Sequence, residues 1–390
     1  MQTKYLLSDI DFDDLEIAAV TDVVHSKWLS LGPKTAEFES RFCEELGAKH
    51  AVAVSSCTAA LHLALMALDI GPGDEVLVPS YTFVASANSI LYQRATPVFV
   101  DINGPHDLNL DVDDLEAKIT PRTKAIMVVH MAGFLADMDR IMAIAEKQGL
   151  VVVEDACHAI GATYVNPGSP YDGRQAGTIG HAGCFSFFAN KNLPAGEGGM
   201  LVTGDEALAN RVRLSRSHGM SKTSWDKANG RAHAYDVVQL GFNYRCTEIT
   251  AALGLAQLAK LPAANERRKR LVEQYRTNLA QTPGITIPFA DRLDDSSHHI
   301  FPIVVDDPHD REPFRQRLLD CGIQTSVHYP PIHEFSLYRA HTDQSTDLAM
   351  TEDVAAREVT LPLHPLLSAS DVDIICRSVN ECLAPVEAIC

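Results

Sequence analysis

Residues 184–204 read CFSFFANKNLPAGEGGMLVTG, which is two apolar runs on either side of a glycine-rich turn. Both runs, CFSFF (184–188) and GMLVTG (199–204), carry the bulky apolar side chains that favour strands. Lys191 follows the first run within three residues. A lysine is usually a solvated surface group, but at the end of a buried strand its amine is partly desolvated and can attack a carbonyl carbon. The stretch therefore predicts two strands with a reactive amine beside them.

Five further apolar runs precede this stretch, and helical patterns separate them. Leu61, Leu65 and Leu68, for example, recur at the spacing that places side chains on one face of a helix. The runs do not alternate between apolar and polar residues, as expected when helices cover both faces of a sheet. This order predicts an α/β fold with a large, doubly wound, mainly parallel sheet of seven strands. The five runs are HAVAV (50–54), EVLVPS (75–80), TPVFVDI (96–102), KAIMVVHM (124–131) and LVVVEDA (150–156).

The pattern changes after about residue 245, where the long helical stretch TEITAALGLAQLAKLPAANERRKRLVEQYRTNL (247–279) begins. We expect Pro262 to interrupt this helix, because proline lacks a backbone N–H. The runs that follow predict a small α+β lobe: ITIPF (285–289), HHIFPIVV (298–305), IQTSVHYPP (323–331) and a last helix after Ser368. We therefore expect a large domain at 1–255, with an interface segment at 1–35, and a smaller C-terminal domain at 256–390.

The composition is that of a globular protein. Charged residues make up 22% of the 390 residues and apolar residues 46%, which excludes a disordered or fibrous chain. The formal net charge of -18 argues against nucleic acid or a membrane as partner. Nine scattered cysteines without a CxxC pair favour a reducing, cytoplasmic location over a disulfide framework or a zinc ribbon. Since no apolar run approaches the roughly 18 residues of a membrane span, we expect neither a signal peptide nor an anchor.

The residues that follow each strand are the first candidates for a site, because ligands of open α/β sheets bind beyond the carboxyl ends of the strands. The small residues SSCTAA (55–60) can begin a helix whose free N–H groups bind phosphate, although they can equally be an ordinary cap. Asp155 ends a buried run with His158 close behind, and each can also be structural. Phe83 can cover a flat ring or belong to the core. Together with Lys191, these positions supply what pyridoxal 5′-phosphate (PLP) requires: a phosphate site, a ring partner, a carboxylate and an amine.

In its motifs the chain resembles the sugar aminotransferases of the DegT/DnrJ/EryC1/StrS family, which are PLP-dependent enzymes of fold type I, the aspartate aminotransferase fold. The resemblance extends nearly from end to end, and the block around Lys191 is its most specific part. The matching segments include WLSLGPKTAEFE (28–39), SSCTAALHLALMAL (55–68), GPGDEVLVPSYTF (71–83), VVVEDACHAIGA (151–162), FSFFANKNLPAGEGGMLVT (185–203) and GFNYRCTEITAALGLAQL (241–258).

The resemblance implies roles for individual residues. Lys191 resembles the lysine that binds the cofactor covalently and moves the proton between cofactor and substrate. Asp155 matches the carboxylate that keeps the pyridine nitrogen protonated, which is physically sound because a nearby negative charge raises the pyridinium pKa. His158 stands where the family has a residue near the ring, and Phe83, with Tyr81 as the alternative, stands where an aromatic residue stacks on it. Phosphate contacts are implied for Cys57, Thr58 and Ser186.

A shared active site is also implied, and with it a homodimer. Asn243 in GFNYR resembles an asparagine that reaches the phosphate from the neighbouring subunit, although it can also be a turn residue after Gly241. Ser30 and Gly32 lie in a segment that crosses the interface in the family. Candidate substrate contacts are Ser30, Trp225, His328 and Tyr329, and further candidates are Trp28, Arg245 and His333. We expect no metal, because neither His328 nor His333 has a cysteine or carboxylate at a suitable spacing.

The implied activity is transfer of an amino group, from glutamate, to a keto group of a nucleotide-linked deoxysugar. The loop Ser56-Cys57-Thr58 and the segments HGMSKTSWDK (218–227) and GFNYR resemble those of enzymes that aminate C4 of a 4-keto-6-deoxyhexose. Amination at C3 and a non-catalytic, regulatory PLP-binding relative remain alternatives. Related dehydratases carry histidine at the position of Lys191, so the lysine found here argues against a dehydratase.

Two departures from the family pattern stand out. Many members have Asn-Gly-Thr where this chain has Ser56-Cys57-Thr58. The motif HxxG continues here with Phe134 instead of a polar residue, which removes support for a sugar contact in that loop.

Overall fold

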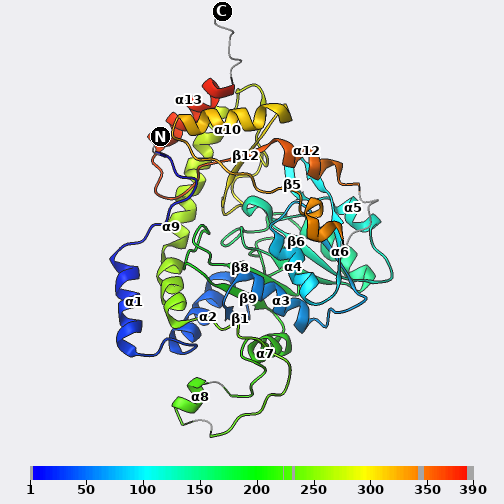
Figure 1. The fold of residues 1–390 in the computed structure, drawn as a ribbon, viewed down its shortest axis with the longest axis vertical. Helices are drawn as coiled ribbons and strands as arrows, with labels where there is room; N and C mark the ends of the chain where they lie inside the picture. The colour runs from blue at the N-terminus through cyan, green and yellow to red at the C-terminus, as the bar shows by residue number, and fades with distance from the viewer. Residues whose placement is uncertain (1–2, 223, 231–232, 341–346, 384–390) are drawn as a thin grey trace, which may run out of the picture.

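Two lobes, joined by one long helix, make up the fold (Figure 1). The structure is a computed structural model that describes residues 3–222, 224–230, 233–340 and 347–383. Helix α9 (Glu248–Leu279) runs from the larger lobe, which contains the large sheet, to the smaller C-terminal lobe. The predicted pairing of a large α/β lobe with a smaller α+β lobe is confirmed.

A sheet of seven strands forms the large lobe, in the order β1-β9-β8-β7-β6-β2-β3. Neighbouring strands from β8 to β3 are parallel, and only β9 runs antiparallel to both of its neighbours. Each strand corresponds to one of the seven predicted runs, so the mainly parallel sheet is confirmed. The strands are β1 (His50–Val54), β2 (Glu75–Pro79), β3 (Thr96–Val100), β6 (Thr123–Val129), β7 (Val151–Asp155), β8 (Ala182–Ser186) and β9 (Gly199–Thr203).

Helices cover both faces of this sheet, as a doubly wound fold requires. Strand β1 shows the arrangement, because Ala51 and Ala53 face one apolar core while Val52 and Val54 face the other. Helices α2 (Pro33–Leu46), α5 (Val112–Ala117), α6 (Met138–Gln148) and the first half of α9 contribute to the first core. Helices α3 (Cys57–Ala67), α4 (Val84–Tyr92) and α7 (Glu206–Ser215) contribute to the second.

Helix α9 continues through Pro262, so the predicted interruption is wrong. Proline at this position leaves the carbonyl of Leu258 without its helical N–H partner. Packing outweighs this loss, because Leu258 and Leu261 are buried in the core of the large lobe while Leu271 and Tyr275 are buried in that of the small lobe. The helix also passes through the expected domain boundary at 255/256, which stays a prediction.

The small lobe is built on an antiparallel sheet of β10 (Ile285–Thr286), β11 (Phe301–Val305) and β12 (Glu358–Leu361). The run 323–331 forms no strand of this sheet and contacts it through the bridge between Ser326 and Thr360 and through hydrogen bonds of His328 to Glu358 and Thr360. Helices α10 (Arg311–Asp320), α12 (Ala349–Arg357) and α13 (Ala369–Leu383) complete the lobe. Further elements of the described ranges are α1 (Asp14–Ser26), α8 (Ser224–Ala228), α11 (Ser336–Arg339), the hairpin of β4 (Ile102–Gly104) and β5 (Asp107–Leu110), and three short 3-10 helices at Met131–Gly133, Pro308–Asp310 and Ile332–Glu334.

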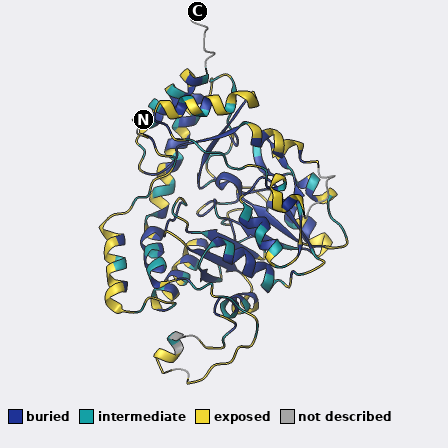
Figure 2. Ribbon diagram, in the orientation of Figure 1, coloured by how far each residue is buried: buried dark blue, intermediate teal, exposed yellow. Residues whose placement is uncertain are grey.

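Two parts of the chain, α1 and the segment around α8, are mostly exposed (Figure 2). Several large apolar side chains lie exposed there: Leu15, Ile17 and Val24 in α1, and Tyr235, Val237, Val238 and Leu240 after α8. Such a surface is typical of a protein interface. Among the helices of the described ranges, none is long and apolar enough to cross a bilayer.

Candidate active site

A cavity of about 410 Å³ lies at the carboxyl ends of β2, β7 and β8, beside the start of α3. This is the edge of the sheet where ligands of open α/β folds bind. The sheet order brings together residues that are far apart in the sequence. Eight residues predicted for the site line the cavity: Cys57, Thr58, Phe83, Asp155, Ser186, Lys191, His328 and Tyr329.

Asp155 is the last residue of β7, and its side chain is fixed by three donors. The hydroxyl of Ser86 donates a hydrogen bond of 2.8 Å to Oδ2. The N–H of Cys157 donates to Oδ1 at 3.3 Å, and the thiol of Cys57 lies 3.9 Å from the same oxygen. Burial raises the pKa of the Cys57 thiol and of the Cys157 thiol, and the negative charge of Asp155 raises both further. The site therefore presents one oriented carboxylate between two neutral thiols.

The start of α3 offers free donors to the cavity. Ser56 is the N-cap, and its side chain accepts a hydrogen bond of 3.1 Å from the N–H of Ala59. The N–H groups of Cys57 and Thr58 precede any helical acceptor and can bind an anion. Cys57 begins the helix as an ordinary helical residue, so the glycine found there in many relatives is not required. A side chain at Gly199 would lie 2.4 Å from the backbone of Ser56, which explains the glycine where β9 passes this turn.

Lys191 lies in the connection between β8 and β9. Its N–H donates to the carbonyl of Phe188 at 2.9 Å, and the buried side chains of Phe187 and Leu193 hold the turn in the core. The amine Nζ lies 3.4 Å from Nε2 of His299, a residue of the small lobe. The amine is thus placed between the cavity and the small lobe.

His158 does not appear among the described lining residues, but it contacts Tyr329, which does. Nε2 of His158 lies 2.9 Å from the hydroxyl of Tyr329. Burial, followed by the charge of Lys191, lowers the pKa of His158 well below its usual value, while burial raises that of Tyr329. Burial also lowers the pKa of His328 to about 4. At neutral pH the two imidazoles and the phenol are therefore uncharged.

Phe83 presents an open aromatic face to the cavity. Its side chain is 55% exposed, and its ring centroid lies 6.0 Å from that of Tyr329. Tyr81, the alternative, is buried and is not one of the described lining residues. The geometry thus favours Phe83 as the ring partner.

Among the described residues that line the cavity, Ser30, Trp225 and Asn243 are not found. Ser30 and Asn243 are exposed. Trp225 packs edge-on against Trp28, with ring centroids 4.8 Å apart, so the two tryptophans contact each other. Within one chain the structure does not bring these three predicted residues to the site.

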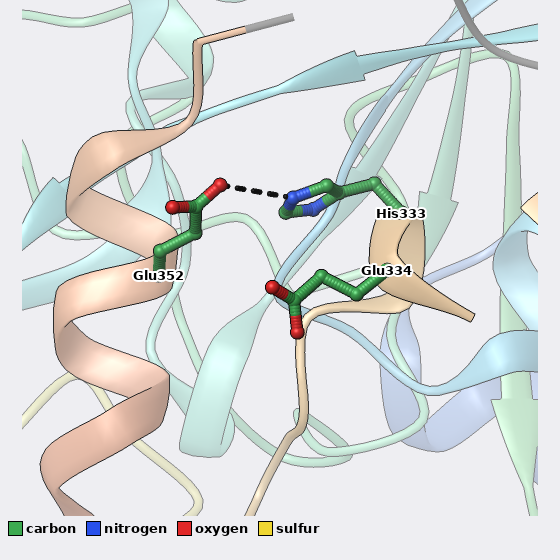
Figure 3. A group of neighbouring side chains, drawn as sticks. All are labelled: His333, Glu334 and Glu352. Carbon is green, nitrogen blue, oxygen red and sulfur yellow. Dashed lines mark hydrogen bonds and ion pairs between the residues drawn. The ribbon is translucent and has the colours of Figure 1, made fainter. Parts of the chain in front are cut away.

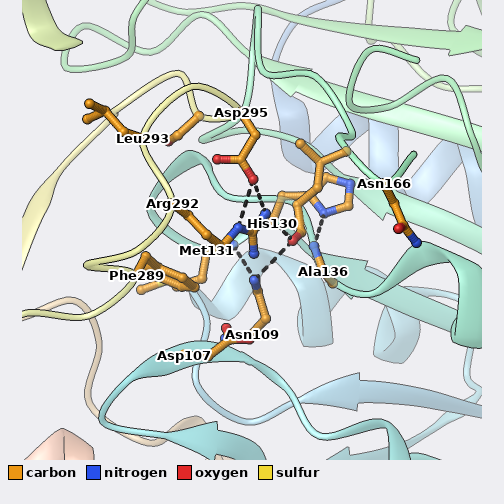
Figure 4. Close-up of polar contacts among 12 residues, drawn as sticks. Asp107, Asn109, His130, Met131, Ala136, Asn166, Phe289, Arg292, Leu293 and Asp295 are labelled. Atoms are coloured by element: carbon orange, nitrogen blue, oxygen red, sulfur yellow. Dashed lines mark hydrogen bonds and ion pairs between the residues drawn. The ribbon is translucent and has the colours of Figure 1, made fainter. Parts of the chain in front are cut away.

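The loop that begins at His130 is held in place by contacts with residues of other segments of the chain (Figure 4). Nε2 of His130 lies 2.8 Å from Glu154, and Asn109 accepts a hydrogen bond of 3.0 Å from the N–H of Met131. Arg292 pairs with Asp295 and donates to the carbonyl of Leu135 at 3.1 Å. The ring of Phe134 stacks on Phe289 at 4.2 Å, which explains why an apolar residue follows this HxxG motif.

A second polar cluster lies outside the cavity, at His333, Glu334 and Glu352 (Figure 3). Ligand atoms of these three residues lie within 4.8 Å of one another, and Nε2 of His333 is 3.2 Å from Glu352. Glu352 is distant from His333 in the sequence and meets it only because folding brings α12 beside the loop. Both glutamates are exposed, and exposed acidic groups commonly gather without binding an ion. We therefore assign no metal to this cluster.

Sequence analysis did not single out three residues that hold the side chains of the site in place: Ser86, which bonds to Asp155, and His299 and Asn192 beside Lys191. Ser86 is the third residue of α4 and belongs to no motif. Asn192 follows Lys191 and is buried, which is unusual for asparagine. His299 belongs to the pair His298-His299 just before β11. Two adjacent histidines beside a buried strand were the signal that could have identified it.

The arrangement fits PLP by its chemistry. The cavity offers an amine for an aldehyde, a carboxylate for a pyridine nitrogen, an aromatic face for the ring, and a helix start with the hydroxyls of Thr58 and Ser186 for a phosphate. Fold and site together define a PLP-dependent transferase of fold type I.

The chain belongs to the DegT/DnrJ/EryC1/StrS aminotransferase family, whose model matches residues 11–380. It is similar to the spore coat polysaccharide biosynthesis protein SpsC of Bacillus subtilis, with 43% identity over 375 residues and 94% of each chain covered. Among solved structures it resembles Helicobacter pylori PseC, an aminotransferase involved in pseudoaminic acid biosynthesis (32% identity, 97% and 99% covered, TM-score 0.89). It also resembles Streptococcus pneumoniae Spr1654 in its PMP form (32% identity, 97% and 99% covered, TM-score 0.90). That protein has been solved in a PLP form as well. The protein is a sugar aminotransferase, and the prediction of PLP as cofactor is confirmed.

Proposed function

We propose that the protein moves an amino group from L-glutamate to the keto group of a nucleotide-linked deoxysugar, at C4 of a 4-keto-6-deoxyhexose. One observation carries the proposal: a single cavity holds the Lys191 amine, the Asp155 carboxylate and the start of α3. The proteins it resembles support a sugar substrate, since SpsC acts in polysaccharide biosynthesis and PseC in pseudoaminic acid biosynthesis.

The proposed roles follow from the positions of the side chains. When bound, PLP supplies an aldehyde for covalent attachment and an electron-withdrawing pyridine ring. Asp155 holds a proton on the pyridine nitrogen, because its fixed negative charge favours the pyridinium form. The N–H groups of Cys57 and Thr58 hold the phosphate at the start of α3, and Phe83 covers the ring.

Lys191 moves the protons of the reaction. In the first half, Nζ takes a proton from the α-carbon of the amino donor, and in the second half it delivers one to the sugar carbon that receives the nitrogen. Tyr329 and His328 form the wall of the cavity near the amine and stay uncharged, so they add no competing charge.

Single half-reactions test this proposal. We expect glutamate to shift the visible absorption of the bound cofactor, and a nucleotide-linked 4-keto-6-deoxyhexose to reverse the shift and appear as the aminosugar by mass spectrometry. A 3-keto isomer that reacts faster would assign the amination to C3. Absence of a shift with glutamate or any other amino acid would contradict the aminotransferase and favour a passive PLP-binding protein.

We further propose a homodimer in which each active site uses residues of both subunits. Asn243 and Ser30 are exposed and are not among the described residues that line the cavity of their own chain, and the exposed apolar residues of α1 and of 235–240 offer an interface. In this arrangement Asn243 reaches the phosphate end of the neighbouring site.

Mixing two inactive or weakened variants tests the shared site. Lys191→Ala removes the amine of its own chain, whereas Asn243→Ala removes a contact from the other chain. We expect a refolded equal mixture to recover about a quarter of the wild-type sites, since half of the dimers are mixed and each has one intact site. The assay is run at limiting PLP. Activity no higher than that of the Asn243→Ala protein alone would refute a shared site.

A further inference from the structure

The Lys191 amine is in contact with a buried histidine to which the proposed chemistry gives no role. His299 is 6% exposed, and its Nε2 lies 3.4 Å from Nζ of Lys191. On its other side, Nδ1 of His299 lies 3.0 Å from Oδ1 of Asn192, the residue that follows the lysine. The imidazole therefore connects two consecutive residues of the Lys191 turn.

The hydrogen bonds of Asn192 fix the tautomer of this imidazole. Its amide nitrogen donates to the carbonyl of Ser297 at 2.7 Å and to Asn265 at 3.0 Å, so the amide oxygen faces His299. Asn265 is oriented in turn, because its own amide donates to the carbonyl of Ile160 at 3.0 Å. An amide oxygen only accepts hydrogen bonds, and Nδ1 of His299 must therefore carry the hydrogen. A neutral imidazole with a hydrogen on Nδ1 has its lone pair on Nε2, the atom that faces Lys191.

The surroundings keep this imidazole neutral. Burial lowers the pKa of His299 well below its usual value, and the Lys191 charge lowers it further. His158 stands beside it, with ring centroids 4.4 Å apart, and its pKa is lowered in the same way. Protonation would also place two positive charges 3.4 Å apart, so His299 remains an acceptor in the pH range where enzymes work.

A glycine of the HxxG motif allows the histidine to reach the lysine. Gly133 has φ +98°, and a side chain there would lie 2.5 Å from Oγ of Ser297 and 3.1 Å from the N–H of His298. The hydroxyl of Ser297 donates to the carbonyl of His158 at 2.6 Å. The N–H of His299 donates to the carbonyl of Ala132 at 3.1 Å. The motif thus lets segment 297–299 of the small lobe dock against the large lobe.

We propose that His299 is a positioning residue for Lys191: its Nε2 accepts a hydrogen from Nζ and so fixes the direction of the amine. This inference depends on the proposed role of Lys191. The contact between the lobes then has a function, because a residue of the small lobe, His299, orients the lysine of the large lobe. Asn192 contributes by holding the only tautomer that can accept.

Substitutions at His299 test the effect on the reaction. We expect His299→Leu to slow the glutamate half-reaction roughly 10- to 100-fold, the loss of one hydrogen bond to a charged group, with little change in the KM for glutamate. His299→Gln is expected to recover part of the rate, because its amide oxygen can take the place of Nε2. His364→Leu is the matched control, since His364 is also buried but neither lines the cavity nor bonds to Lys191 in the described residues. Circular dichroism and thermal unfolding check that each variant is folded.

A spectroscopic measurement on the wild-type holoenzyme tests the tautomer directly. With ¹⁵N-labelled histidine, and His299→Gln to assign the signal, Nδ1 should be protonated and Nε2 unprotonated from about pH 5.5 to about 8.5. Asn192→Leu removes the acceptor and should produce a mixture of tautomers. A hydrogen on Nε2, or titration near pH 6.5, would overturn the proposal.

The outcomes also separate this inference from the proposed function. If the wild-type protein accepts no amino donor, the proposed function fails and the positioning role fails with it. If the wild type reacts and His299→Leu reacts at the same rate, the proposed function stands and only the role of His299 is refuted.

Discussion

Replacing Lys191 with alanine is expected to abolish covalent attachment of PLP and turnover together. The structure places the Lys191 amine in the connection that follows β8, where it lines the cavity that contains Asp155 and the start of α3. The proton transfers alone are worth roughly 10²- to 10⁴-fold in rate, and loss of the attachment adds to this. The visible absorption of the attached cofactor, the mass of the borohydride-reduced protein and the rate of amino transfer are the three measurements.

The control for this variant is Lys147→Ala, which removes an exposed lysine that pairs with Glu116 on the surface. It should keep the absorption and the rate of the wild type. A small primary amine added to Lys191→Ala should restore part of the turnover, because it can replace the missing base. Normal turnover by Lys191→Ala, or a cofactor still attached to the protein, would refute the assignment of this lysine.

The strands of the large sheet could be predicted because their signal is local. Runs such as HAVAV and LVVVEDA are apolar throughout, and burial on both faces by the two cores is what this pattern requires. The position of Asp155 at the end of β7, and of Lys191 in the connection after β8, followed directly from these runs. Pro262 shows the limit of local reasoning, since packing of both halves of α9 keeps the helix intact where the backbone alone would break it.

The residues that were missed share a different property: their partners come from distant parts of the chain. His299 meets Lys191 only after the small lobe docks, and Glu352 meets His333 only when α12 lies beside the loop. Ser30 and Asn243 were predicted for the site, yet within one chain they are exposed and are not among the described residues that line the cavity. Sequence patterns report the surroundings of each segment and not which segments meet.

Replacing Asp155 with asparagine is expected to lower kcat on the order of 10²- to 10³-fold, as loss of a single preorganised electrostatic group does in other active sites. The change keeps the shape of the side chain. Its amide oxygen can still accept from the N–H of Cys157, and its amide nitrogen can donate to the hydroxyl of Ser86 in place of the present bond. Because the fold tolerates the change, the loss of rate measures the negative charge itself.

The ring nitrogen of ¹⁵N-labelled PLP gives an independent readout of the same charge. In the wild type it should carry a proton at neutral pH, whereas in Asp155→Asn it should not, because a neutral amide no longer favours the pyridinium form. Ser86→Ala, which removes one hydrogen bond to the carboxylate but leaves the charge, should cost far less than Asp155→Asn. Asp113→Asn, at an exposed ion pair with Arg140, should change neither quantity. A nitrogen that stays protonated in Asp155→Asn, together with an unchanged kcat, would remove Asp155 from the proposed chemistry.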